Sequence, residues 1–483
     1  MMLPLGGRVG AWAGAVIRFR FAETTVHAAS AMLLSPTLSA EMRRILALAW
    51  PVVLTSLNWT ILHVTDVAVV GLVSTGEAAA LGASRSLTFP GIVVGLGWLT
   101  GILVYVSRAD GAGELRETGR VLHQGMMLAL VLGLISGLAL FLWPEPMLIA
   151  LGVAPDTAPE AAHVVRVMAI AYPFQLIMIA ASFFLEGVSR PRRVTVVNLA
   201  ILPLNALLAW VFATGQLGAP AMGAAGAALA TAIASALGAI GMVGAAWTLP
   251  RAGQRGVRDL SALGGRDSWA GAWRLAGFGV VPAIASGLEL VGFSILIALS
   301  TQLGTTTAHA FQIVFSIHNV TFAVALGLGS AAGVRVGNAV GEGVAHDAAR
   351  RTAIAALLAA LATGALSVLL MTLALPVVSV FPATGPVHQL AAAMLLLWAP
   401  FILFDGVQVV FVYALRSLGD QVMAGVNGII AFFLVTGGLG VLLVHGGHGP
   451  NGLVLASGIG MVAAALLHGL RLGWVSRRFR SRS

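Results

Sequence analysis

Long runs of apolar residues, separated by short polar stretches, make up most of this chain. A helix needs about 20 apolar residues to cross the roughly 30 Å of hydrocarbon in a bilayer. Runs of this length predict twelve membrane-spanning helices and an all-α membrane protein. The runs cover residues 45–71, 78–107, 122–143, 161–186, 194–214, 221–249, 274–300, 307–334, 352–381, 388–415, 422–445 and 451–474.

The polar connections between these runs alternate in charge. Arginines occur in the connections after the second, fourth, sixth, eighth and tenth runs, and on both flanks of the whole set. The alternate connections, such as 145–160 and 382–387, contain none. The positive-inside rule then predicts that both termini are cytoplasmic, in a multi-pass protein of a bacterial inner membrane. An odd number of spans would destroy this alternation, so it supports an even count.

The longest polar stretch between two runs, residues 250–273, lies near the middle of the chain. We interpret it as a cytoplasmic linker between two lobes of six helices, residues 45–249 and 274–474. Residues 475–483 form a basic cytoplasmic tail. Residues 1–44 are predicted to be a disordered or interfacial extension. Within it, residues 1–31 read as unstructured or as a misassigned start, with Met32 and Met42 as alternative first residues.

The two lobes resemble each other at a constant offset. The segment Val106–Gly113 matches Val336–Gly343 at an offset of 230 residues. Other matches at or near this offset pair Gly97 with Gly327, Arg120 with Arg350, Leu185 with Leu415, and Pro51 with Pro282. Six spans per lobe is an even number, so both lobes enter the membrane in the same orientation. This predicts a parallel repeat, with a substrate cleft between the lobes that opens by rocking.

Composition places most of the chain in lipid. Hydrophobic residues make up 58% and charged residues 9%, whereas soluble domains carry about 25% charged residues. The net charge of +9 comes from arginines between the spans, which indicates membrane topology rather than a nucleic-acid partner. The chain has no cysteine, which excludes disulfides and thiolate chemistry. We find no nucleotide-binding loop, zinc pattern or nucleophile elbow, so we predict neither an enzyme nor a cofactor.

Three acidic residues lie within predicted spans: Asp66, Glu289 and Asp405. An ionised carboxylate at the centre of a spanning helix costs about 2.5–3.5 kcal/mol on insertion scales. Such side chains must face the protein interior or water. Burial disfavours the charged form of a carboxylate, and a nearby cation favours it. These three groups are therefore suited to exchanging a proton or a metal cation for an organic cation.

Each acid also has a structural interpretation. Asp66 and Arg85 fall at similar depth on neighbouring helices and could form an ion pair with no further role. Glu289 has no basic residue within its own span. Asp405 follows Pro400 and shares a helix face with Gln408. We interpret the other polar residues of the spans as packing or interhelical contacts, namely Asn58, Asn198, Asn205, Thr231, His63, His309 and His318.

The residues around these acids resemble the multidrug and toxic compound extrusion (MATE) family, in particular its NorM-like branch. The resemblance runs from about residue 45 to residue 470. The resemblance rests on four groups of residues. In the first lobe these are Pro51–Val–Val with Val64–Thr–Asp66, and Leu185–Glu–Gly187. In the second lobe they are Leu288–Glu289–Leu290, and Phe404–Asp405–Gly–Val–Gln408 with Ala414–Leu–Arg416 and Gly419–Asp420. Three acids in register with a duplicated frame of twelve spans make the resemblance specific.

The resemblance implies a secondary active exporter of cationic amphipathic drugs, coupled to inward movement of H⁺ or Na⁺. It places Asp66 in a first-lobe cation site with Asn205 and Thr231 as supporting polar residues. It places Glu289 and Asp405 in a second-lobe site, as candidate Na⁺ ligands, with Gln408 in support. Two departures, Ala209 and Phe401, remove oxygen atoms that some members of the family have. Because Na⁺ prefers several oxygen ligands and a proton needs one carboxylate, we expect protons as the coupling ion.

Two other functions compete with this one. A flippase of lipid-linked saccharides shares a related architecture, but it needs cationic side chains to hold phosphates, and few arginines lie within the spans. A membrane-embedded enzyme or a channel would not need coupled carboxylates in both lobes. The expected partners are small organic cations and the lipid bilayer, and we expect the protein to act as a monomer.

Overall fold

The computed structural model describes residues 36–263 and 265–480, and helices are the only regular structure in this part of the chain. The first half contains α2 (Pro36–Gly71), α3 (Thr75–Gly111), α4 (Leu115–Leu142), α5 (Pro144–Ala150), α6 (Ala158–Ala169), α7 (Tyr172–Gly187), α8 (Pro191–Thr214) and α9 (Gly223–Trp247). We call α2–α9 the N-lobe. A connection that contains the short helix η1 (Leu260–Ala262) leads to the second half.

The second half, which we call the C-lobe, begins with α10 (Arg266–Gln302) and α11 (Thr305–Gly341). It continues with η2 (Ala345–Asp347), α12 (Ala348–Thr372), α13 (Ala374–Val378), α14 (Gly385–Trp398), η3 (Ala399–Phe401) and α15 (Ile402–Ser417). It ends with α16 (Gln421–Gly428), the π-helix η4 (Ile429–Gly437), α17 (Gly438–Leu443), η5 (Val444–His448) and α18 (Gly449–Arg480).

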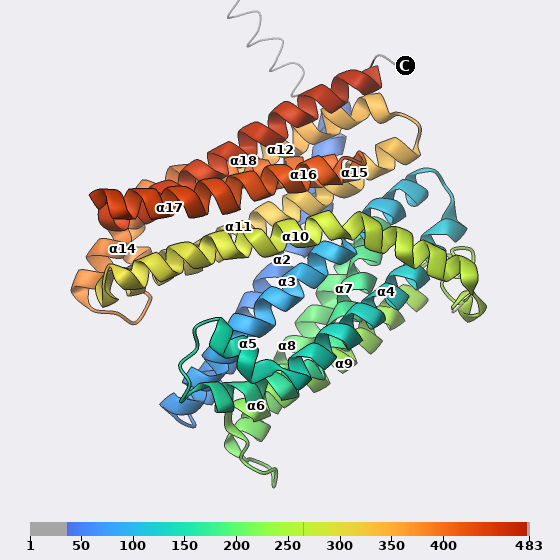
Figure 1. The fold of residues 1–483 in the computed structure, drawn as a ribbon. Coiled ribbons are helices and arrows are strands. Elements are labelled where there is room, and N and C mark those ends of the chain that lie inside the picture. Colours follow the sequence, from blue (N-terminus) through green and yellow to red (C-terminus); the bar gives the residue numbers. More distant parts are fainter. Residues whose placement is uncertain (1–35, 264, 481–483) are drawn as a thin grey trace, which may run out of the picture.

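The helices account for the twelve predicted crossings. Ten helical stretches are long and apolar enough to span a bilayer, and α6 and α7 together form a further span, bent by 50°. One of the ten, Gln421–Arg478, is 58 residues long. The chain reverses within it at Gly447 and Gly449, whose φ angles of 85° and 52° only glycine adopts readily. Figure 1 shows α17 and α18 side by side, so this stretch crosses twice.

Several helices extend beyond the predicted apolar runs. The helix α2 begins at Pro36, so residues 36–44, which we expected to belong to an N-terminal extension, are helical. The helix α10 begins at Arg266, inside the predicted linker, and α18 continues to Arg480, inside the predicted tail. Apolar runs end where the hydrocarbon ends, but backbone hydrogen bonds continue into the polar interface. Residues 1–35 and 481–483 lie outside the described residues.

The two lobes converge at one end of the molecule and diverge toward the other (Figure 1). The end at which they converge carries the connection between α3 and α4, the connection between α11 and α12, and residues 248–263 (Figure 1). We call it the arginine-rich end. Here the matching segments of the two lobes touch: Gly337 faces the Ser107 hydroxyl, and Gly341 faces the Arg108 carbonyl. Equivalent positions meet in this way at the axis of a two-fold repeat, so the predicted parallel repeat is confirmed.

The crossing of α3 and α11 depends on small residues. A Cβ atom at Gly111 would overlap the backbone of Asn338, and one at Gly341 would overlap the backbone of α3. Apolar side chains continue the contact toward the membrane, because Leu103 of α3, Leu328 of α11 and Val409 of α15 share one buried cluster. The two lobes therefore pack backbone against backbone at this end.

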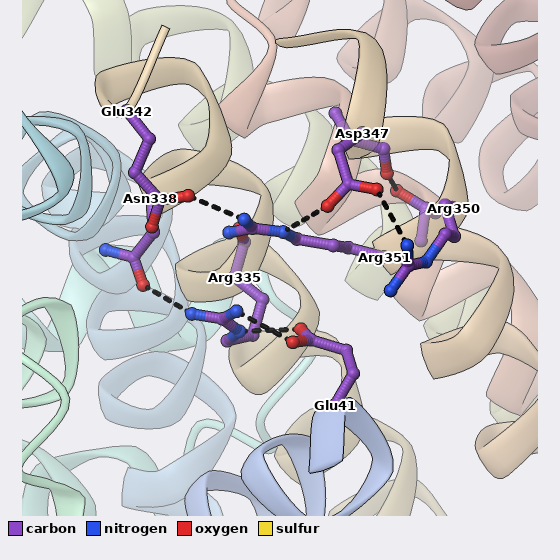
Figure 2. Close-up of polar contacts among 9 residues, drawn as sticks. Glu41, Arg335, Asn338, Glu342, Asp347, Arg350 and Arg351 are labelled. Carbon is purple, nitrogen blue, oxygen red and sulfur yellow. Dashed lines mark hydrogen bonds and ion pairs between the residues drawn. The ribbon is translucent and has the colours of Figure 1, made fainter. Parts of the chain in front are cut away.

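Buried polar contacts reinforce the closed end (Figure 2). Arg335 of α11 donates from Nε and Nη2 to the two carboxylate oxygens of Glu41 on α2, at 2.7 and 2.8 Å. Asn338 Nδ2 donates to the Ser107 carbonyl at 2.8 Å. Arg351 of α12 supports this arrangement by donating to the Arg335 carbonyl at 3.0 Å. Residues of both lobes are thus joined by charged and amide side chains away from water.

Candidate functional site

A cavity opens inside the N-lobe around Asp66. Its walls come mainly from α2, α3, α7, α8 and α9. The cavity has a volume of about 70 Å³, which is room for several water molecules. Its polar lining includes Asn58, His63, Asp66, Arg85, Asn205 and Thr231. The three residues that the family resemblance grouped in the first lobe, Asp66, Asn205 and Thr231, therefore share one cavity.

Asp66 is buried and has partners on three other helices. Asn205 of α8 donates from Nδ2 to Oδ1 at 2.8 Å. Arg85 of α3 lies with Nη2 at 3.4 Å from Oδ2, so the ion pair that the sequence left open is present. The Thr231 hydroxyl of α9 faces the same carboxylate. The carboxylate thus points into the protein and not into lipid.

Polar contacts between α2 and α8 hold this arrangement in place. Pro51 lies inside α2 and has no backbone N–H, and its carbonyl accepts a hydrogen bond from Thr195 Oγ1 at 2.8 Å. Two turns further along α2, and one turn further along α8, Asn58 Nδ2 donates to the Asn198 carbonyl at 3.3 Å. These contacts set the depth of α2 relative to α8, and so they place Asp66 opposite Asn205.

The C-lobe has its own buried acid, Asp405, in the first turn of α15. Gln408 Nε2 donates to Oδ1 at 3.1 Å, as expected from their shared helix face. His318 of α11 lies with Nε2 at 3.2 Å from Oδ2. Each oxygen of Asp405 therefore has a side-chain nitrogen atom within hydrogen-bond distance.

The His318 ring is surrounded by aromatic side chains. The centroids of Phe293, Phe315, Phe322 and Trp398 lie 5.0–5.8 Å from the imidazole centroid. These rings come from α10, α11 and α14. They exclude water from the His318–Asp405 pair and fix the orientation of the imidazole. The C-lobe site is thus a carboxylate–imidazole pair inside an aromatic shell.

Glu289 of α10 is half-buried. The charges of Asp405 and Arg416, both on α15, act on its carboxylate. The side chain of Glu289 makes no hydrogen bond or ion pair within residues 36–263 and 265–480. Arg416 is itself only partly satisfied, because its buried Nε has no partner in the same residues. The carboxylate of Glu289 is therefore available to a mobile cation.

Sequence reasoning missed several residues of these sites. We interpreted His318 as a packing residue near a helix end, but it lies in the middle of α11 and contacts Asp405. Asn58 and His63 line the Asp66 cavity. Glu186 of α7 is a further buried acid, and Ser330 of α11 donates to it at 2.5 Å. A repeat offset of 230 residues aligns Glu186 with Arg416, which could have drawn attention to both.

Na⁺ was an alternative coupling ion at Glu289 and Asp405. Among the described residues, no three side chains of His, Asp or Glu converge as a metal site. The donors that surround Asp405 are nitrogen atoms, whereas Na⁺ requires oxygen ligands. The residues present around Asp405 therefore suit a proton better than a sodium ion.

Comparison with known proteins places the chain in a family. The family model described as MatE matches residues 51–211 and 273–441, one match in each lobe. "Probable multidrug resistance protein NorM" from Bradyrhizobium diazoefficiens is 31% identical over 447 residues, which cover 91% of this chain and 95% of the relative. "Multidrug resistance protein MdtK" from Yersinia pestis is 27% identical over 445 residues, covering 91% and 96%.

Solved structures share the fold. The crystal structure of the eukaryotic MATE transporter AtDTX14 superposes with a TM-score of 0.80 at 19% identity, covering 92% of this chain and 99% of that chain. An outward-facing multidrug resistance MATE family transporter of the MOP superfamily gives a TM-score of 0.80 at 16% identity, covering 91% and 97%. At this level of identity the likeness concerns the fold alone.

Proposed function

Because this chain belongs to the MatE family of membrane transporters, we propose that it is a secondary active multidrug efflux transporter. It exports cationic amphipathic drugs in exchange for protons. Multidrug resistance in the names of the relatives supports the export of drugs. The coupling to protons is argued from the residues of the two lobes.

The observation that carries the proposal is the burial of carboxylates in both lobes of a protein surrounded by lipid. Asp66 and Asp405 are buried, and Glu289 is half-buried, with charges of another helix of its own lobe acting on it. Each acid in a spanning helix costs about 2.5–3.5 kcal/mol on insertion scales. A chain that keeps them uses their charge, and an anion held away from water binds a cation by direct Coulomb attraction.

Proton coupling is supported by the atoms around the C-lobe acids. Side-chain nitrogen atoms of His318 and Gln408 already lie within hydrogen-bond distance of the two oxygens of Asp405. Phe401 of the C-lobe, like Ala209 of the N-lobe, stands at a position where some members of the family have an oxygen ligand. Glu289 is a carboxylate without a hydrogen-bond partner in the described chain. One carboxylate is enough to carry a proton, and an organic cation competes with that proton for the same negative charge.

The closed end of the molecule supports a scheme for outward transport. By the positive-inside rule, the arginine-rich end faces the cytoplasm. In this scheme, the cytoplasmic side is closed when Glu41 and Arg335 are paired, and the acids are then accessible from the opposite side of the membrane. Protonation then releases the drug outward. Parting of the lobes at the arginine-rich end returns the acids to the cytoplasm, where the proton is exchanged for a new cation. This scheme needs a single protomer in an inner membrane.

The proposal is tested with purified protein in liposomes. An imposed pH gradient should drive ethidium across the membrane, and a Na⁺ gradient alone should not. We expect Glu289→Gln and Asp405→Asn to abolish the gradient-driven flux while the protein remains folded. Glu160→Gln, at an exposed position on α6, is the matched control and should transport at the normal rate.

Two results would contradict the proposal. Dye flux that is independent of any gradient would exclude antiport, and full coupling in both acid variants would remove the site assignment. Movement of a lipid-linked saccharide in place of dye would favour the flippase. That function finds little support in the N-lobe cavity, because its one lining arginine, Arg85, already pairs with Asp66.

A further inference from the structure

The ion pair between Arg85 and Asp66 is looser than the ion pair that joins the two lobes. Arg85 approaches Asp66 with one nitrogen, and Nη2 lies 3.4 Å from Oδ2. Arg335 instead binds Glu41 with two nitrogens, at 2.7 and 2.8 Å. Charge-assisted hydrogen bonds of full strength measure about 2.7–2.9 Å. The Arg85 guanidinium is therefore weakly held at the carboxylate.

Arg85 is also the more accessible member of its pair. Its side chain is 21% exposed, whereas that of Asp66 is 4% exposed. The second contact of the guanidinium is a hydrogen bond from Nη1 to the His63 carbonyl at 3.0 Å. The guanidinium thus lies on the wall of the cavity and covers Asp66, held there by one carboxylate oxygen and one carbonyl.

Two side-chain amide oxygen atoms in the cavity have no partner within the described residues. They are the Oδ1 atoms of Asn58 and Asn205, whose side chains are 3% and 0% exposed. Their amide orientations are fixed, because Asn58 Nδ2 donates to the Asn198 carbonyl and Asn205 Nδ2 donates to Asp66. Buried acceptors are normally satisfied. The cavity therefore contains more acceptor atoms than the Arg85 guanidinium satisfies.

We propose that Arg85 is a tethered counter-ion that occupies the cation position at Asp66 in the empty transporter. A monovalent organic cation binds in the N-lobe only by displacing the guanidinium. Arg85 thereby sets the affinity of this lobe for its cargo. This inference rests on the proposed function, because it assumes that Asp66 meets cationic cargo.

The charges of the two lobes support this role. In the N-lobe cavity, Asp66 faces Arg85, so the two charges cancel, and His63 and Tyr172 are the other titratable side chains on the lining. In the C-lobe, the charges of Asp405 and of one arginine, Arg416, act on Glu289, so this region holds two acids and one arginine. Coulomb attraction for an incoming cation is therefore stronger in the C-lobe as the structure stands. Removal of the Arg85 charge would give the N-lobe a net negative site of its own.

A purely structural ion pair predicts the opposite result. If Arg85 only neutralised a buried charge, its loss would leave Asp66 unpaired and the protein less stable. No site would be gained, because the cavity would have no function. The two interpretations therefore differ in the sign of the change in cation affinity.

The test compares binding of tetraphenylphosphonium, a permanent monovalent cation, to purified wild-type protein and to Arg85→Gln. We expect binding to Arg85→Gln to be about tenfold tighter or more, since a repelling charge is removed from a low-dielectric cavity. The double variant Arg85→Gln/Asp66→Asn should lose this gain. Arg85→Lys, which keeps the charge, should bind as the wild type does. Arg166→Gln, at a half-buried position on α6 that does not line the cavity, is the control.

Unchanged or weaker binding in folded Arg85→Gln, together with a lower unfolding temperature, would overturn the inference and leave a structural pair. A gain that persists in the double variant would also overturn it, because the gain would not depend on Asp66. Absence of phosphonium binding in every variant would contradict both this inference and the proposed efflux function. If the wild type exchanged dye normally but Arg85→Gln did not bind the phosphonium more tightly, the inference about Arg85 would be wrong and the proposed efflux function would stand.

Discussion

Glu41 and Arg335 are separated by 294 positions in the sequence, and their side chains form a bidentate ion pair between the two lobes. Both side chains are at least 90% buried. A bidentate pair has full strength only at one relative position of α2 and α11, because both oxygens and both nitrogens must meet at once. The pair is therefore matched to one state of the molecule, the state in which the arginine-rich end is closed.

Neutralising Glu41 should shift the molecule toward a state that is open at the arginine-rich end. Glu41→Gln leaves the Arg335 charge buried without its counter-ion, and breaking a buried pair in this way costs about 3–5 kcal/mol. The cost falls on the closed state alone. Because the chain has no cysteine, spin labels can be placed at Glu114→Cys and His346→Cys, both exposed positions at this end. Distances between the labels should lengthen or broaden in Glu41→Gln.

The control for this measurement is Glu160→Gln in the same labelled protein. It removes one acidic charge at an exposed site on α6, so the label distances should not change. If Glu41→Gln gave the wild-type distance distribution, the ion pair would not select between the two states.

A side chain at Gly341 should oppose closure of the same end. The Cβ atom of Gly341→Ala would overlap the carbonyl of Arg108. Overpacking of this kind costs about 1–3 kcal/mol. We expect a lower unfolding temperature and longer distances between the labels at positions 114 and 346. Gly244→Ala on α9, where no atom lies within 4 Å of the new Cβ, should be neutral, and an equal effect of both changes would argue against the helix crossing.

Replacement of His318 should slow gradient-driven exchange. His318→Phe fits an environment of four aromatic rings and removes one of the two side-chain nitrogen partners of Asp405. Loss of a partner by a buried acceptor costs about 1–3 kcal/mol, so we expect the rate of ethidium exchange to fall by about 5- to 150-fold. His309→Phe, at an exposed position on the same helix, should exchange at the normal rate. Equal rates in all three proteins would show that His318 only fills space.

Ser330→Ala should destabilise the contact between α7 and α11. It leaves the buried carboxyl of Glu186 without the hydroxyl that binds it. A buried polar group without a partner costs about 1–3 kcal/mol, which should appear as a lower temperature of thermal unfolding. Ser316→Ala on the same helix removes a hydroxyl that bonds only to its own helix, at the Gln312 carbonyl. A larger shift for Ser316→Ala than for Ser330→Ala would contradict this account.

The candidate sites were predictable to different degrees. Asp66, Glu289 and Asp405 could be found because an acid inside an apolar run can be recognised without knowledge of how the helix is oriented. The pairing of Asp405 with Gln408 followed from helical spacing. The partners His318, Arg85 and Asn205 come from other helices, and neither spacing nor composition chooses among the polar residues at similar depth. That choice depends on how each helix is rotated about its own axis.

The sequence by itself determined the twelve crossings, the two parallel lobes and the three acids within the spans. Each of these follows from a local requirement, because lipid demands an apolar run of fixed length and leaves a charge no partner outside the protein. The tertiary structure decided which side chains meet. The pairing of Glu41 with Arg335, the cover of Arg85 over Asp66 and the aromatic shell of His318 all depend on packing between helices far apart in the chain. That packing is set by small residues at the helix crossings and by the rotation of each helix about its own axis. Neither can be read from the pattern of hydropathy along the chain.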